Sequence, residues 1–460
     1  MTLQTIGAWN AAMAGAPRAP AERLIGPGGL VVLSPHPDDE TLGASALLTR
    51  AADLGRRIGL VALTDGEGSH PRSRLVPPPR LAAIRAAEQA AALAALGCGA
   101  AEVLRLSLPD GASGRSAGFE TAAARIAALC DAVGASALAA PHPDDPHPDH
   151  HAAAALALAL GEARPDLRIL FYEVWSRRLA AAEPFRAEGL TPFRVAADPA
   201  RKRAALACHR SQLGEIVPDD PDGFVLPPWF LAAQDDPWER YSWRAMPGRP
   251  PEPGHFARLY AADGDPWHVR SSAYEAEKRA ATVAILEPRH FRHALEAGCG
   301  EGFLSRALLG AGIAERVTGF DREPAIVARA ARHPETGALA DFVSGSLPDD
   351  LPDGRFDLAV FSEVLYFLEE TALARLAAAL PARLVPDAEI LIVSYLGRTD
   401  TPLGGRAASD FFVACLGEAV TPVKATETPD YRIERLRYRP APGAVPAPEG
   451  GDPTGAAARA

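Results

Sequence analysis

Short apolar runs alternate with longer stretches of helical periodicity along most of the chain. In the first half, the runs that predict strands are 30–33, 58–63, 102–106, 136–140 and 168–175. The stretches between and after them that predict helices are 41–50, 80–96, 119–133, an alanine-rich run ending at 160, and 201–213. Strands separated by helices in this way predict a mostly parallel sheet with helices on both faces.

The same alternation returns after a segment rich in proline and glycine, 247–254, which is typical of a linker. A helix is predicted at 274–286, and strands are predicted to begin near 293, 317, 356 and 389. We therefore expect two Rossmann-like α/β domains, at 28–245 and 246–440. A lead at 1–27 precedes them, and a tail at 441–460, rich in proline, alanine and glycine, is expected to be disordered.

Histidines and carboxylates gather where two of the first-half strands end. The run 30–33 leads into Pro35-His36-Pro37-Asp38-Asp39-Glu40, and the run 136–140 leads into 141–151, which holds four histidines and three aspartates. Only 12 histidines occur in the whole chain. In a parallel sheet both loops open on the same edge, and a divalent cation would offset the repulsion between the crowded carboxylates. The two loops together predict a metal site.

These two motifs resemble the signatures of the LmbE-like/PIG-L zinc-dependent N-deacetylases, over roughly residues 25 to 215. The resemblance extends to residues 64–67, Arg85, Glu88 and residues 108–111. It implies that His36, Asp39 and His150 bind zinc and that Asp38 is the general base. It also implies that His147 stabilises the oxyanion, that Asp149 tunes His147, and that Asp110 contacts the substrate. Residues 142–145 nearly copy the first motif, and we expect a loop there because His147 to His150 has the spacing that fits the family.

The chemistry implied is hydrolysis of an acyl amide. Three protein ligands leave the fourth position of zinc open for water, whose pKa zinc lowers to about 7. Asp38 cannot easily bind the same metal as its neighbour Asp39, so it is free to take a proton from the water. A protonated His147 can hydrogen-bond the oxyanion. Iron or cobalt could replace zinc with these ligands.

Several other polar and aromatic residues have simpler interpretations. Arg85 and Glu88 lie three apart on a predicted helix, which is typical of an ordinary surface pair. His209 is expected to have a structural role. Trp229, Trp238 and Trp243 are typical of packing between domains, although they could also wall a sugar site.

In the second half, glycines follow the strand that begins near 293. The stretch Glu296-Ala297-Gly298-Cys299-Gly300-Glu301-Gly302 lets a ligand approach the backbone closely. About twenty residues later a strand ends in Asp321, a position that suits a pair of ribose hydroxyls. No Gly-x-Gly-x-x-Gly motif follows the strand and no Gly-Lys-Ser/Thr occurs. A further strand runs into the polar loop 362–366.

These residues resemble class I S-adenosylmethionine-dependent methyltransferases, and among them the rhizobial nodulation N-methyltransferases, over roughly 255 to 435. The resemblance implies that the methyl donor is contacted by Glu296, Gly298, Gly300, Gly302 and Asp321. It also implies that Trp267 and Tyr274 cover the bound donor and that Glu363 and Tyr366 contact the methyl acceptor. Many members place an acid beside adenine where this chain has Ser346, so the adenine contact falls to the Ser346 hydroxyl or amide. A role for Tyr366 in the core of the turn stays open.

Composition narrows the possible partners. A formal net charge of −11 without a lysine or arginine cluster argues against nucleic-acid binding. No apolar run reaches the ~20 residues of a membrane span, and no signal-peptide pattern starts the chain. We expect a cytoplasmic protein that acts on a small molecule or glycoconjugate. Its five widely spaced cysteines are predicted to be reduced core residues.

The two motif sets suggest consecutive reactions. An amide nitrogen shares its lone pair with the carbonyl and is a poor nucleophile, whereas the amine that deacetylation frees can attack a sulfonium methyl group. We expect zinc-dependent N-deacetylation of an amino sugar conjugate, followed by N-methylation of that amine. The alternative is an active deacetylase with a methyl-donor-binding domain that is non-catalytic or methylates an unrelated small molecule. Methylation at oxygen also stays open.

Overall fold

The computed structural model describes residues 4–164, 166–244, 250–251, 254–333, 339–397, 399 and 401–440. The chain divides into two compact units. The first comprises Met1–His255, Glu363–Ala377 and Ser394–Glu418, and the second comprises Phe256–Ser362, Ala378–Val393 and Ala419–Ala460. Most of the predicted linker, at 247–249 and 252–253, and the predicted tail at 441–460 lie outside the described residues.

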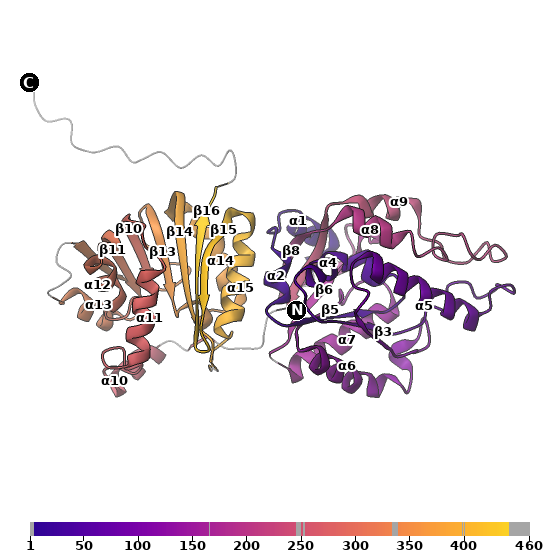
Figure 1. Ribbon diagram of the computed structural model, residues 1–460, viewed down its shortest axis with the longest axis horizontal. Coiled ribbons are helices and arrows are strands. Elements are labelled where there is room, and N and C mark those ends of the chain that lie inside the picture. Colours follow the sequence, from indigo (N-terminus) through magenta and orange to yellow (C-terminus); the bar gives the residue numbers. More distant parts are fainter. Residues whose placement is uncertain are drawn as a thin grey trace, which may run out of the picture. The chain divides into compact units, whose positions relative to one another are not determined.

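A seven-stranded sheet with the order β4-β3-β2-β5-β6-β9-β8 forms the centre of the first unit (Figure 1). Its strands are β2 (Gly29–Ser34), β3 (Ile58–Ala62), β4 (Glu102–Arg105), β5 (Ala135–Pro141), β6 (Arg168–Tyr172), β8 (Leu190–Ala196) and β9 (Trp238–Arg244). The first five strands of this order run parallel, and β9 pairs antiparallel with both β6 and β8. The predicted mostly parallel sheet is confirmed, and β8 and β9 extend it on one side.

Helices cover both faces of this sheet (Figure 1). They are α1 (Ile6–Ala14), α2 (Ala21–Ile25), α3 (Asp39–Gly43), α4 (Ser45–Asp53), α5 (Pro78–Ala95), α6 (Phe119–Val133), α7 (Pro148–Ala163), α8 (Pro199–Leu206) and α9 (Pro228–Ala232). The buried side chains of α6 and α7 form one core with those of β2, β3, β5 and β6. Two helix predictions were wrong in extent: the predicted 41–50 helix is broken at Ala44, and α8 ends well before residue 213.

The second unit has its own seven-stranded sheet, with the order β12-β11-β10-β13-β14-β16-β15. Its strands are β10 (Phe291–Ala297), β11 (Ala314–Asp321), β12 (Ala340–Ser344), β13 (Phe356–Ser362), β14 (Leu384–Tyr395), β15 (Val420–Glu427) and β16 (Tyr431–Tyr438). The strands from β12 to β14 run parallel, and β15 pairs antiparallel with β16. The second half is therefore also Rossmann-like, as predicted.

The remaining helices are α10 (His255–Ala262), α11 (Ala273–Ala284), α12 (Phe303–Gly310), α13 (Pro324–Ala331), α14 (Glu370–Ala379) and α15 (Gly405–Leu416). In the second unit, Leu304 and Leu308 of α12 pack on Ala294 and Val317 of the sheet. The five cysteines are free, and Cys98, Cys130 and Cys299 are buried. Among the described helices, none combines the length and the apolar character that crossing a membrane requires.

Candidate metal centre and methyl-donor site

The first histidine motif forms a tight loop where β2 ends. Ser34 Oγ donates to the carbonyl of His36 (2.6 Å), and the His36 amide donates to Asp39 Oδ2 (2.9 Å). Helix α3 begins at Asp39, directly after this loop. The loop is thus closed by its own polar groups, and it presents His36 and Asp39 at the carboxyl edge of the sheet, where ligands bind in open α/β folds.

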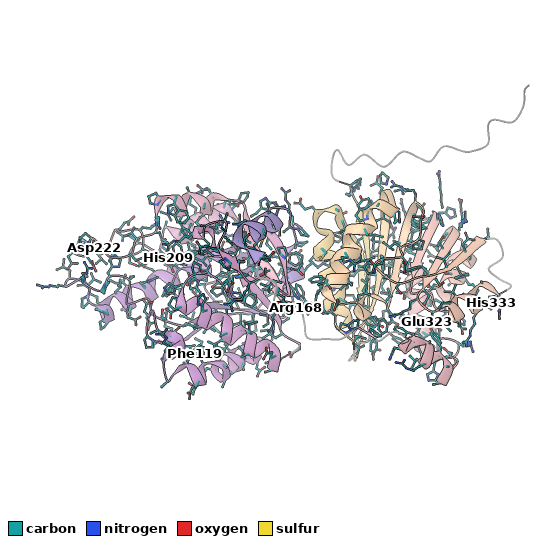
Figure 2. All side chains as sticks on the ribbon, turned by 180° about the vertical axis from the view of Figure 1, so that it is seen from behind. Phe119, Arg168, His209, Asp222, Glu323 and His333 are labelled. Atoms are coloured by element: carbon teal, nitrogen blue, oxygen red, sulfur yellow. The ribbon has the colours of Figure 1, made fainter. Side chains whose placement is uncertain are left out.

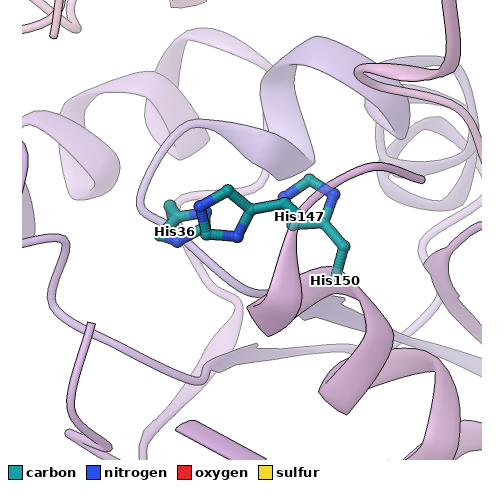
Figure 3. A group of neighbouring side chains, drawn as sticks. All are labelled: His36, His147 and His150. Carbon is teal, nitrogen blue, oxygen red and sulfur yellow. The ribbon is translucent and has the colours of Figure 1, made fainter. Parts of the chain in front are cut away.

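The second motif approaches the first from the start of α7. Asp39 Oδ2 lies 3.1 Å from His36 Nδ1 and 3.1 Å from His150 Nε2. The ring of His147 is centred 4.5 Å from that of His36 and 5.2 Å from that of His150 (Figure 3). One nitrogen from each of the three rings lies within 4.8 Å of the others. The structure therefore brings the three predicted ligands together and places the ring of His147 beside them.

Carboxylates surround these histidines. His36 Nε2 lies 3.1 Å from Asp149 Oδ2 and 3.2 Å from Asp110 Oδ1. Burial opposes a charged ring, but the neighbouring carboxylates raise the pKa of His36 well above its usual range. The pKa of His150 rises to about 9 because Asp39 and Asp145 outweigh its burial. Carboxylates that favour an extra proton here would also favour a divalent cation.

The donor set fits zinc. His150 is fully buried, and in the described part of the chain neither of its ring nitrogens has a hydrogen-bond partner. A buried polar atom without a partner is costly, and metal coordination through an imidazole nitrogen would remove that cost. Two imidazoles and one carboxylate are a ligand set that zinc uses in catalytic sites, where one position stays open.

Asp38 lies beside this group and faces Arg85. The Arg85 guanidinium is 3.3 Å from Asp38 Oδ1 and donates to the carbonyls of Gly66 (3.0 Å) and Pro37 (3.3 Å). Burial raises the pKa of Asp38 to about 6, although Arg85 opposes the rise. A buried carboxyl that ionises near neutral pH suits a general base.

Arg85 and Glu88 are not the surface pair that their spacing favoured. Both are buried on α5, with exposures of 2% and 9%. Glu88 accepts from the amide (2.7 Å) and the hydroxyl (2.6 Å) of Ser211. The surface prediction was wrong because α5 turns this face toward the first motif and the segment after α8.

Asp149 contacts His36 more closely than it contacts His147. Its carboxylate also accepts from the Gly111 amide (2.7 Å) and from the amide and hydroxyl of Ser113 (2.9 and 2.7 Å). Its nearest approach to His147 Nδ1 is 3.9 Å. Together these contacts fix the loop after β4 against the two histidine motifs, and they place Asp110 of that loop beside His36.

His147 caps α7. Its Nδ1 accepts the amide hydrogen of Asp149 at 3.3 Å. Burial and the nearby His36 and His150 lower the pKa of His147 to about 4, so the ring is neutral at neutral pH. Because Nδ1 accepts a hydrogen bond, the ring proton resides on Nε2.

Two other histidines of the first unit, His142 and His209, lie in packed surroundings. His142, in the near-copy of the first motif, stacks on Phe185 with ring centres 4.3 Å apart and lies beside Trp9. His209 is fully buried, with Nε2 3.1 Å from Thr41 Oγ1. Figure 2 shows it inside the first unit, in contrast to the exposed Asp222. Residues 142–147 form a loop, as expected.

In the second unit, the glycine turn adopts the backbone that its composition predicts. Gly298, Gly300 and Gly302 have φ values of 73°, 52° and 75°, which favour glycine. The Gly300 amide donates to Asp321 Oδ2 at 3.0 Å. Glu296 is buried at the end of β10 beside the Ser305 hydroxyl, and burial raises its pKa to about 7. The predicted methyl-donor residues therefore lie around one turn.

Some of the other predicted methyl-donor contacts have different neighbours. The Ser346 amide donates to Asp350 Oδ2 (2.9 Å), so that amide is already engaged. Trp267 is 40% exposed and packs edge-on against Tyr260, with ring centres 5.3 Å apart. A Cβ on Gly300 would lie 3.7 Å from the Tyr260 hydroxyl. Tyr260 is thus a candidate that sequence reasoning missed, because no motif marks it.

The remaining predicted residues lie at the start of α11 and in the segment that follows β13. Tyr274 is the second residue of α11, and its ring lies 6.0 Å from that of Tyr431. Glu363 directly follows β13 and has a φ of 54°, which is uncommon for a residue with a side chain. Tyr366 is buried, with its ring 4.8 Å from that of Phe367.

Two family models match the chain. Residues 31–160 match PIG-L, described as GlcNAc-PI de-N-acetylase, and residues 294–387 match a methyltransferase domain. The chain joins a PIG-L deacetylase domain to a methyltransferase domain. The resemblances found in the two motif sets are confirmed: the two histidine motifs lie within the first matched range, and the glycine turn and Asp321 lie within the second.

Individual relatives divide in the same way. Nodulation protein S of Sinorhizobium fredii is 27% identical over 172 residues, which cover 37% of this chain and 79% of that protein. The 1D-myo-inositol 2-acetamido-2-deoxy-alpha-D-glucopyranoside deacetylase of Kineococcus radiotolerans is 32% identical over 156 residues, which cover 33% of this chain and 41% of that protein. This chain thus matches less than half the length of that relative.

Among solved structures, the N-methyltransferase NodS from Bradyrhizobium japonicum WM9, in complex with S-adenosyl-L-homocysteine, is 23% identical. The match covers 39% of this chain and 95% of that chain, with a TM-score of 0.35.

Proposed function

We propose that the protein is a zinc-dependent N-deacetylase and an S-adenosylmethionine-dependent N-methyltransferase that act in sequence on one amino sugar conjugate. The observation that carries the hydrolase is the position of Asp39 Oδ2, 3.1 Å from a histidine nitrogen of each loop. An amino sugar as substrate is supported by the relative that is named as a deacetylase of an acetamido sugar.

His36, Asp39 and His150 would hold the zinc ion, which when bound acts as a Lewis acid that polarises a carbonyl and acidifies water. Asp38 takes the proton of the attacking water, whose oxygen bonds to the amide carbon. Arg85 fixes Asp38 in place through its buried contact at 3.3 Å. The carbon–nitrogen bond then breaks, the nitrogen takes up a proton, and the products are acetate and a free amine.

His147 would stabilise the oxyanion as a neutral donor. Its Nδ1 is occupied by the Asp149 amide, which leaves Nε2–H to donate. The side chain is about one-third exposed, so it lies on the open side of the group. With a pKa lowered to about 4, His147 takes this role as the neutral ring and not as the imidazolium. Asp149 orients His36, and Asp110 beside it would meet the substrate.

In the methyltransferase domain, the turn 298–302 would receive the methyl donor. The Asp321 carboxylate accepts from the amides of Gly300 and Glu323, one on each oxygen, and keeps the remaining lone pairs for the ribose hydroxyls. Glu296 lies at the base of the turn, and Glu363 and Tyr366 would meet the acceptor. The free amine attacks the methyl carbon, the sulfur–methyl bond breaks, and the amine loses one proton to solvent.

One assay tests the sequence of reactions. The full-length protein is incubated with an N-acetylglucosaminyl conjugate, zinc and S-adenosylmethionine, and the mass of the conjugate is followed. We expect loss of one acetyl group and then gain of a methyl group on the freed nitrogen. Deacetylation without methyl gain across a panel of conjugates would refute the coupling and favour a methyltransferase domain that is non-catalytic or serves an unrelated small molecule.

A further inference from the structure

A buried carboxylate behind His150 has no role in the reaction described above. Asp145 lies in the loop between β5 and α7 and is fully buried. Its Oδ1 lies 2.9 Å from His150 Nδ1. The two atoms are within bonding distance but out of line, since neither has a hydrogen-bond partner among the described residues. Asp145 Oδ1 is nevertheless the acceptor that an Nδ1–H of His150 would face at this distance.

The other oxygen of Asp145 is bound to the backbone. Oδ2 accepts from the amides of Val174 (2.9 Å), Trp175 (2.7 Å) and Ser176 (3.3 Å), in the loop that follows β6. These bonds fix the carboxylate in a closed, fully buried setting. Oδ1 therefore points at His150 from a rigid support, and not from a mobile side chain.

We infer that Asp145 is a positioning residue that holds His150 in the tautomer and orientation needed for metal binding. With Nδ1–H donating to Asp145, the lone pair of the ring lies on Nε2, which faces Asp39 at 3.1 Å. A carboxylate behind a histidine ligand typically contributes about 10–100-fold in metal affinity. The inference rests on the proposed function, because it concerns the same zinc site.

An asparagine at this position separates the two roles of Asp145. In Asp145→Asn the amide oxygen can still accept from the three backbone amides, so the loop after β6 keeps its support. The NH2 group then faces His150 Nδ1 and forces that nitrogen to accept, which moves the ring proton to Nε2. The variant should fold like the wild type and bind zinc more weakly.

The neighbouring residue supplies a matched control. Asp144 has the same side chain and lies in the same loop, but its carboxylate pairs with Arg186, at 2.6 Å from Nε. Asp144→Asn makes the same chemical change one residue away and should leave zinc affinity unchanged.

The experiment measures zinc affinity of the full-length wild type, Asp145→Asn and Asp144→Asn by competition with a chromophoric chelator. Thermal unfolding of the metal-free proteins and the visible spectrum of the cobalt-loaded proteins are recorded in parallel. We expect a roughly 10–100-fold weaker zinc affinity and an altered cobalt spectrum in Asp145→Asn alone, with metal-free unfolding unchanged.

The outcomes separate the inference from the proposed function. If the wild type binds zinc and Asp145→Asn binds it equally well, the inference is overturned and the zinc site stands. If Asp145→Asn loses affinity only together with metal-free stability, Asp145 is a structural cap and the inference is again overturned. If the wild type itself has no zinc affinity, the proposed hydrolase fails and the inference fails with it.

Discussion

Replacing Arg85 by methionine should destabilise the first unit and stop hydrolysis. The guanidinium is 2% exposed and serves the Asp38 carboxylate and the carbonyls of Gly66 and Pro37. Breaking a buried ion pair costs about 3–5 kcal/mol. Asp38, whose pKa is about 6, would take up a proton once the guanidinium is gone, so we expect the lower end of that range. The protonated Asp38 could then no longer act as a base.

Urea unfolding followed by tryptophan fluorescence measures this cost. Five of the six tryptophans lie within residues 1–255, so the signal mainly reports the first unit. With an m value of about 3 kcal/mol per M urea, a loss of about 3 kcal/mol lowers the midpoint by about 1 M.

A control variant and a double mutant make the test specific. Glu88→Gln changes a buried charge one turn along α5 and keeps a polar contact to Ser211, so it should cost no more than about 1.5 kcal/mol. Asp38→Asn should cost less in the Arg85→Met background than in the wild type, because the two side chains interact. The reasoning would be refuted if the free energy of unfolding of Arg85→Met were within about 1 kcal/mol of that of the wild type, and if the losses caused by Arg85→Met and Asp38→Asn were additive in the double mutant.

Three further predictions address the two domains separately. Asp38→Asn should lower kcat for hydrolysis by about 10²–10⁴-fold while sparing methyl transfer to a supplied free amine, and equal loss of both activities would contradict the assigned role. Burial raises the pKa of Glu296 from 4.5 in the unfolded chain to about 7 in the folded chain. At pH values between these two, the folded state keeps a proton on Glu296 that the unfolded state releases. Stability of the second unit should therefore fall by about 3 kcal/mol as pH rises through this range, with a flatter profile in Glu296→Gln, as measured by hydrogen exchange of β10 amides. Gly302→Ala should lose S-adenosylmethionine binding in calorimetry and keep hydrolysis, because Gly302 has a φ of 75° and a Cβ there would lie 2.8 Å from Phe342.

The meeting of the two ligand loops could be predicted because it follows from topology. Loops after parallel strands share one edge of the sheet, and the strand-loop-helix pattern around His36 and around His150 can be recognised in the sequence. The turn before α12 could also be recognised, because Gly298, Gly300 and Gly302 have backbone conformations that favour glycine.

The partners of buried charges could not be predicted, because they depend on how elements face each other. Arg85 and Glu88 have the spacing of a surface pair, yet α5 directs one to Asp38 and the other to Ser211. Asp149 follows His147 closely in sequence, yet the start of α7 turns its carboxylate toward His36 and the loop after β4.

The antiparallel strands β8 and β9 were missed for a different reason. Residues 197–237 separate them in sequence, so no hairpin signal is present. In β9, buried Tyr241 and Trp243 alternate with polar residues, and Glu239 on the same face is also buried. Glu239 accepts from Lys202 Nζ (2.7 Å) and from the Ala46 amide (2.9 Å), contacts that make a buried carboxylate tolerable in a strand.

The most direct test of the account is the zinc content of folded, full-length protein, measured by native mass spectrometry. The wild type is compared with His36→Gln and with His142→Gln, which changes the matching histidine of the near-copy motif. We expect one zinc ion per chain in the wild type and in His142→Gln, and none in His36→Gln. Zinc retained by His36→Gln and lost by His142→Gln would contradict this expectation.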